Sequence, residues 1–166
     1  MTATRCALLA TAVIAATVAL PSPATADDPQ PCASGQLVVH ALPMLAGAGH
    51  RGVPLLFTLT PGVGACTLTG YPGVDSGAGG PLIHADRSPR GYLGGLPGGE
   101  DVPPTVTLSP DQSARALVEG LAVDSEGNPC PTYTDLLVTA PDTTDTVTVP
   151  VAIDACRLQV HPVTTA

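Results

Sequence analysis

The sequence predicts an all-β protein, an antiparallel β-sandwich held by two disulfides. Apolar side chains alternate with a period of two along most of the chain, which is typical of half-buried strands. Clusters of Pro, Gly, Ser and Asp separate these short segments and favour turns. Four widely spaced cysteines follow a secretory leader. Short strands at such regular spacing favour a sandwich over other all-β folds.

Nine segments are expected to form the strands. The clearest is 53–60, in which Leu55, Phe57 and Leu59 share one face. The expected strands are 37–42, 53–60, 67–71, 82–85, 105–108, 114–118, 136–140, 146–151 and 158–163. Residues 113–122 also have a helical alternative, and we interpret them as a strand. On that strand, Arg115 and Glu119 are expected to point into solvent.

Residues 1–26 are predicted to be a signal peptide. Arg5 supplies a positive start, and the apolar run at 7–20 has 14 residues, fewer than the roughly 20 that a spanning helix needs. We expect cleavage after Ala26 and a single mature domain at 27–166 with no transmembrane segment. An uncleaved N-terminal anchor is the alternative. Since no lipid-modified cysteine box is present, we expect a secreted, extracellular protein, either released or associated with the cell wall.

The cysteines are predicted to form two disulfides. Cleavage removes Cys6 and leaves Cys32, Cys66, Cys130 and Cys156, an even set in an exported chain. The gaps between them are too long for zinc-ribbon spacing. A hairpin of the first two strands would bring Cys32 near Cys66, and the last hairpin would bring Cys130 near Cys156. We therefore predict these two pairs among the three possible connectivities.

The composition excludes several classes of function. All six basic residues are arginines, so a Schiff base, a phosphate-loop lysine or a pyridoxal anchor cannot form. The 14 acidic residues give a net charge of −8, or −9 without the leader, which disfavours nucleic acids and anionic lipids. No cofactor is expected.

Residues 72–104 are expected to form a long loop with one short strand inside it. They hold 9 Gly and 6 Pro in 33 positions, a composition unsuited to continuous strands. Arg87, Arg90 and Tyr92 lie within this loop, and arginine and tyrosine often anchor interfaces. These three residues are the candidate partner-binding residues. The alternative is a solvated, flexible loop without a partner.

Three motifs carry a resemblance to a known family. They are CTLTGYPGV at 66–74, VTLSPDQSA at 106–114 and LQVHPV at 158–163, the last shortly after Cys156. Over about 32–163, the chain resembles the secreted actinobacterial family catalogued as domain of unknown function 4232. Asp111 stands where that family usually has glycine, a change that a turn tolerates. The resemblance implies an immunoglobulin-like sandwich outside the cytoplasmic membrane and no established reaction.

Catalytic motifs are missing from the sequence. Neither G-x-S-x-G nor H-E-x-x-H occurs. A hydrolase could still assemble Ser76, His84 and Asp86 into a triad, because triads are defined by geometry rather than by order.

Two histidines suggest a metal-binding alternative. His40 and His161 end similar segments, LVVH and LQVH, in the first and last strands. If these strands lie side by side, the two imidazoles could bind Cu or Zn, with Met44 as an added soft ligand.

The predicted function is that of a secreted, non-catalytic, immunoglobulin-like module. It would bind an extracytoplasmic protein, glycan or cell-envelope component through residues 72–104. A small extracytoplasmic Cu- or Zn-binding protein is the first alternative, and a hydrolase is the second.

Overall fold

The computed structural model describes residues 28–166, which contain twelve strands and no helix. The predicted signal peptide at 1–26 lies outside the described residues. The strands are β1 (Leu37–Ala41), β2 (Leu45–Gly47), β3 (His50–Leu59), β4 (Cys66–Thr69), β5 (Gly73–Ser76), β6 (Asp86–Arg87), β7 (Thr105–Leu108), β8 (Ala114–Leu121), β9 (Thr132–Thr139), β10 (Thr146–Asp154), β11 (Leu158–Val160) and β12 (Thr164–Thr165).

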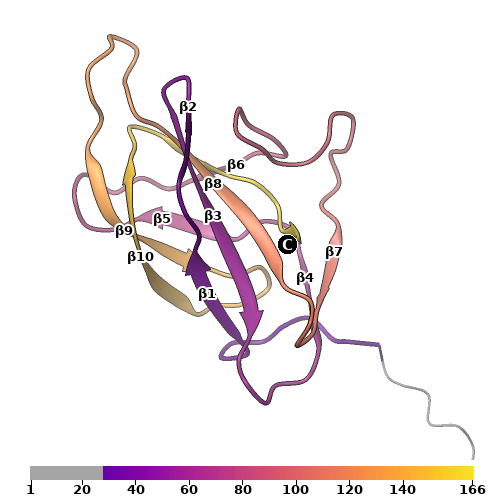
Figure 1. Cartoon of the computed structure of the whole chain (residues 1–166). Helices are drawn as coiled ribbons and strands as arrows, with labels where there is room; N and C mark the ends of the chain where they lie inside the picture. Colours follow the sequence, from indigo (N-terminus) through magenta and orange to yellow (C-terminus); the bar gives the residue numbers. More distant parts are fainter. Residues whose placement is uncertain (1–27) are drawn as a thin grey trace, which may run out of the picture.

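The largest sheet has seven strands. Its order is β1-β3-β8-β11-β6, with β2 pairing with β3 and β12 pairing with β8. A two-residue turn joins β2 to β3, and both of its residues, Ala48 and Gly49, have positive φ (46° and 84°). Turns of this kind match the right-handed twist of a hairpin. The β2–β3 hairpin therefore adds β2 alongside the start of β3, where β3 also pairs with the end of β8 (Figure 1).

A second layer packs against one face of this sheet. It consists of the three-stranded sheet β10-β9-β5 and the two-stranded sheet β4-β7. In Figure 1, β5, β9 and β10 lie behind β1, β3 and β8. The predicted all-β sandwich is thus confirmed. The expectation of antiparallel pairing is wrong at one place, because β6 pairs with β11 in parallel.

The core between the layers is mainly aliphatic. Leu55 and Phe57 of β3 and Tyr133 and Leu136 of β9 are fully buried and belong to one hydrophobic cluster. The Tyr133 hydroxyl donates to the carbonyl oxygen of Pro81 at 2.7 Å, so its buried polar atom is satisfied. Burying a Leu, Val or Phe side chain stabilises the fold by roughly 1.5–3 kcal/mol. Since large aromatic residues are few, stability depends on many such small contributions.

The predicted disulfides, Cys32–Cys66 and Cys130–Cys156, are both confirmed. β1 and β3 pair antiparallel, which brings the segment before β1, with Cys32, near the segment after β3, where Cys66 begins β4. The N–H of Cys32 also donates to the carbonyl oxygen of Thr67 at 2.9 Å. β9 and β10 pair in the same way and bring the second pair together. The hairpin reasoning is therefore confirmed along with the pairing.

Residues 72–104 contain more β-structure than the sequence predicts. The expected strand at 82–85 is wrong, because β5 and β6 form on either side of it. β5 pairs with β9, and the chain after it stays close to the β9 backbone. A side chain at Gly79 would collide with the carbonyl oxygen of Thr132, and φ there is +130°. Glycine permits this approach, whereas its abundance alone suggests only a loop.

The expected last strand at 158–163 ends early, because β11 stops at Val160, and a separate short strand, β12, follows at Thr164–Thr165. Both strands pair with β8, and the chain leaves β8 between them. Pro162 has no N–H to donate, and the N–H of Val163 donates instead to the carbonyl oxygen of Gly70 at 2.8 Å. This departure opens space beside β8.

Within residues 28–166, no helix has the length and apolar character needed to cross a membrane.

Removing either disulfide should lower the free energy of unfolding. The bridges join residues 34 and 26 positions apart, so each is expected to contribute about 3.5–4 kcal/mol. Urea titration of a Cys130→Ala, Cys156→Ala double variant and of the Cys32→Ala, Cys66→Ala counterpart would measure both losses. Losses below about 1 kcal/mol in both variants would contradict this stabilising role of the disulfides.

Candidate functional site

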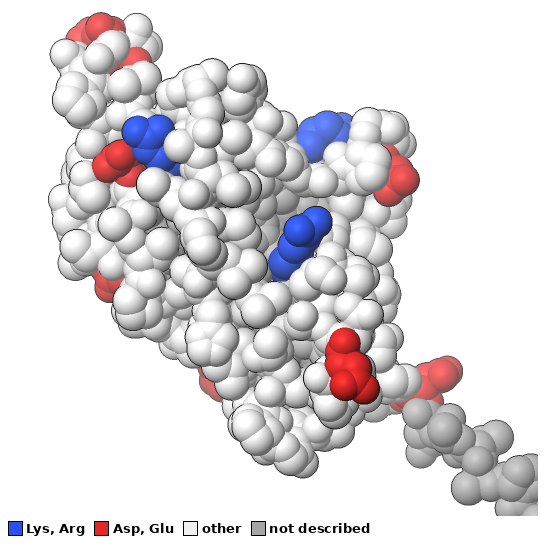
Figure 2. Space-filling view, in the orientation of Figure 1, with Lys and Arg blue, Asp and Glu red and all other residues white. Residues whose placement is uncertain are grey.

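The outer face of the seven-stranded sheet carries the candidate site. Side chains alternate along β8, so Ala114, Ala116 and Val118 point into the core. Residues 115, 117 and 119 point to the opposite, outer face. Strand register places Gly52 of β3 and Gln159 of β11 on either side of Glu119. β1, β3 and β8 lie in front in Figure 1, so Figure 2 shows this face, on which charged groups are few and well separated.

Glu119 is buried on this face, contrary to the expectation that it points into solvent. Its side chain is 1% exposed, because residues 88–96 cross over it. The backbone N–H groups of Tyr92 and Leu93 donate to its two carboxylate oxygens at 3.0 and 2.9 Å. No arginine pairs with it among the described residues. Loop backbone amides therefore provide much of the compensation that a buried carboxylate requires.

Two histidines complete the surroundings of Glu119. Nδ1 of His50 lies 2.6 Å from Oε1, although the angles of this contact are not those of a hydrogen bond. Nε2 of His161 lies 3.4 Å from Oε2, and its Nδ1 lies 2.9 Å from the carbonyl oxygen of Ser88. Since a carbonyl can only accept, Nδ1 of His161 donates there. Nε2 can then donate to Glu119 only when the ring carries a second proton.

These contacts determine the ionisation of Glu119. Burial by itself would raise the pKa of Glu119. The N–H groups of Leu93 and Tyr92 and the imidazoles of His161 and His50 act in the opposite direction, because they stabilise the carboxylate. Together they hold the pKa of Glu119 below its ordinary value of 4.5. The carboxylate is therefore ionised at neutral pH.

Glycines allow the loop to close over this cluster. A Cβ on Gly91 would lie 2.5–2.8 Å from polar atoms of Glu119, His161 and Gln159. A Cβ on Gly52 would lie 2.9 Å from Leu93, which covers that part of β3. The loop and the sheet therefore approach each other so closely that a side chain at Gly91 or Gly52 would have to displace its neighbours.

The predicted partner-binding residues have different roles in the structure. Tyr92 stacks on His50, with ring centroids 4.7 Å apart, and remains 62% exposed. Arg90 donates to the carbonyl oxygens of Pro97 and Glu100 and pairs with Asp101 at 2.8 Å. Arg90 therefore holds the loop together. Arg87 is exposed on β6.

The histidines proposed as metal ligands are not brought together. His40 is exposed on β1, whereas His161 follows β11, and β3 and β8 lie between those strands. The condition for that site, adjacent first and last strands, is not met, because β1 pairs with β3 alone. Met44 is exposed on the chain between β1 and β2. In residues 28–166, no group of three or more His, Cys, Asp or Glu side chains has the geometry of a metal site.

The residues proposed as a hydrolase triad also have other partners. Ser76 is buried, and its Oγ accepts from the N–H of Ile83 and donates to the carbonyl oxygen of Pro81. His84 pairs with Asp75 at 2.6 Å rather than with Asp86.

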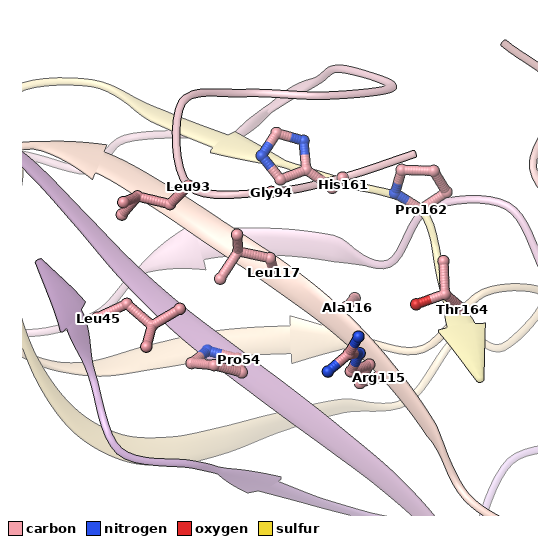
Figure 3. A pocket seen from close by; sticks show the side chains of 11 residues that line it. Leu45, Pro54, Leu93, Gly94, Arg115, Ala116, Leu117, His161, Pro162 and Thr164 are labelled. Carbon is pink, nitrogen blue, oxygen red and sulfur yellow. The ribbon is translucent and has the colours of Figure 1, made fainter. Parts of the chain in front are cut away.

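A pocket of about 180 Å³ lies beside the covered cluster, where the chain leaves β8. Figure 3 shows Leu45 and Leu93 toward one end and Arg115 and Thr164 toward the other. Leu117 lies between these ends, so the lining is largely apolar. A second pocket of about 240 Å³ borders His50, Glu119 and Arg157.

The pattern of β8 could not reveal the role of Glu119. Glutamate at an outward position usually faces water, and the segment that covers it lies about 26 residues earlier in the sequence. The proximity of Gly91 and Tyr92 to a charged strand residue appears only in three dimensions.

A family model matches residues 32–164, almost all of the described chain. The chain belongs to the family described as domain of unknown function, DUF4232. The membership of this family that the three motifs predict is therefore confirmed. No curated protein and no solved structure matches this DUF4232 chain.

Replacing the buried carboxylate should loosen the loop of this DUF4232 domain. In a Glu119→Gln variant, the side-chain NH2 group would take the place of one carboxylate oxygen and face the N–H donors of the loop. The free energy of unfolding should therefore fall by about 2 kcal/mol. Hydrogen exchange at the Tyr92 and Leu93 amides should become faster. Glu100→Gln, an exposed change in the same loop, is the matched control and should cost less than about 0.5 kcal/mol. Equal exchange rates in both variants would contradict the anchoring role.

Acid should remove the contribution of Glu119. Because the folded-state pKa lies below the ordinary value of 4.5, the stabilisation is present above pH 4.5 and is lost as pH falls through the folded-state pKa. We expect the difference in unfolding free energy between the wild type and Glu119→Gln to shrink from pH 5 downward. A difference that grows on acidification would contradict this assignment.

Proposed function

We propose that this DUF4232 chain is a non-catalytic binding module that recognises a protein, glycan or cell-envelope component through the outer face of its seven-stranded sheet. The observation that carries the proposal is the buried Glu119 carboxylate, which fastens residues 88–96 across that face and leaves Tyr92 exposed. A fixed loop loses little conformational freedom when a partner binds.

The exposed residues around the loop suit such a role. Tyr92 stacks on His50, which limits its motion, and tyrosine is among the residues that dominate binding energies at interfaces. Leu45 is 45% exposed on β2, close to Tyr92 and Leu93, which pack beside Gly47. An aromatic ring and neighbouring aliphatic side chains on an open surface are typical of an interaction site.

The proposal includes a location outside the cytoplasmic membrane. Two disulfides are compatible with an oxidising compartment, and the leader at 1–26 has the features of a signal peptide. In this interpretation the protein is secreted by an actinobacterium and is either released or retained at the cell wall.

A binding role also agrees with the state of the polar side chains. Ser76, Glu119 and His161 are buried and make contacts that hold loops to sheets. A reactive centre would require such groups to face a substrate. We therefore propose that their role is structural and that recognition depends on the exposed surface.

Crosslinking to intact cells and to culture fluid tests this proposal. A Tyr92→Ala variant should recover at least about fivefold less of any specific partner than the wild type, because a central aromatic anchor contributes more than about 1 kcal/mol. Val147→Ala, which removes an exposed side chain from β10, is the control and should recover the partner fully. No specific partner from either source, or equal recovery with Tyr92→Ala, would refute the proposal.

A further inference from the structure

The 180 Å³ pocket contains a cation that lacks a partner. Arg115 lines it from β8, and none of the ion pairs or side-chain hydrogen bonds in the described part of the chain includes its guanidinium. Three of the other four described arginines, Arg51, Arg90 and Arg157, each lie within 4.0 Å of a carboxylate. In a chain with net charge −8, an unpaired arginine in an apolar pocket provides a local site for an anion.

Backbone donors lie on the same pocket. Gly94 and Gly95 line it, and neither N–H finds an acceptor within residues 28–166. The neighbouring donors are used, since the N–H of Gly91 donates to Gly94 and that of Leu96 donates to Pro89. The pocket therefore combines one guanidinium with apolar walls and a stretch of glycine backbone.

The pocket is also polarised along its length. Leu45 and Leu93 lie toward one end, whereas Arg115 and Thr164 lie toward the other (Figure 3). A ligand that complements it has an aliphatic group and a carboxylate within a few ångströms of each other. Its volume of about 180 Å³ is below the roughly 300–1,000 Å³ of pockets that enclose whole small-molecule ligands. It therefore suits one residue of a larger partner.

We propose that the Arg115 pocket binds the carboxyl-terminal residue of a partner polypeptide that ends in an aliphatic side chain. The terminal carboxylate lies against Arg115, and the side chain fills the apolar end. A chain terminus offers both groups on a single residue, and capture of a terminal carboxylate is an established mode of peptide recognition. This inference rests on the proposed binding function and specifies part of the partner.

The test uses the peptide N-acetyl-Ala-Ala-Leu with a free carboxylate, titrated into the domain and followed by amide chemical shifts in NMR spectra. We expect a dissociation constant on the order of 1 mM. The shifted amides should be those of residues 93–95, 115–117 and 164. The same peptide with a carboxyl-terminal amide should bind about tenfold more weakly, because it lacks the charge.

Matched variants locate the carboxylate. Arg115→Gln is an exposed change that should preserve the fold and remove the tenfold preference for the free acid. Arg157→Gln makes the same charge change elsewhere on the domain and should leave the preference intact. Three results would overturn the inference: equal affinity for the free acid and the amide, chemical-shift changes outside the pocket, or no binding at a peptide concentration tenfold above the expected dissociation constant. Any of these results alongside Tyr92-dependent crosslinking would refute this inference and leave the proposed function standing.

Discussion

The buried carboxylate of Glu119 links the sheet to the loop that covers it. An ionised carboxylate away from water is costly unless hydrogen bonds compensate for the lost hydration. Two amides of the loop provide much of that compensation, and two imidazoles lie beside the carboxylate. The dependence is mutual, because the amides of Tyr92 and Leu93 need acceptors once the loop lies on the sheet. The position of residues 88–96 therefore depends on a charge carried by a distant strand.

The sandwich and the loop on its outer face are held in place by different interactions. Between the sheets, an aliphatic core and two disulfides at hairpin ends fix the sandwich. On the outer face, polar contacts hold the loop, and Arg90 fastens its far turn through Pro97, Glu100 and Asp101. Because apolar burial contributes less there, the loop should open more readily than the core. Its cover over β8 is thus the part of the fold most sensitive to charge.

Patterns that act over short distances in the sequence were sufficient to predict most of the framework. Alternation of apolar residues located β3, β7 and β8, and the order of the strands explained both cysteine pairs. The prediction was wrong where the outcome depended on contacts between distant segments. Glu119 has the pattern of a solvent-facing residue, yet a loop covers it. His161 was paired with His40 because their local segments are alike, whereas strand order places them apart.

The Arg115 pocket exists because the loop at 88–96 covers only part of the outer face of β8. Residues 88–96 cover Glu119 and approach Leu117, but the next outward residue on β8, Arg115, lies beyond them. Pro162 turns the final segment away from β8 at the same place, so neither neighbour fills the space. An apolar wall and an exposed cation therefore meet at the boundary between covered and open sheet. A pocket of this origin should keep its shape only while Glu119 holds the loop, which makes the ionised carboxylate a condition for binding at Arg115.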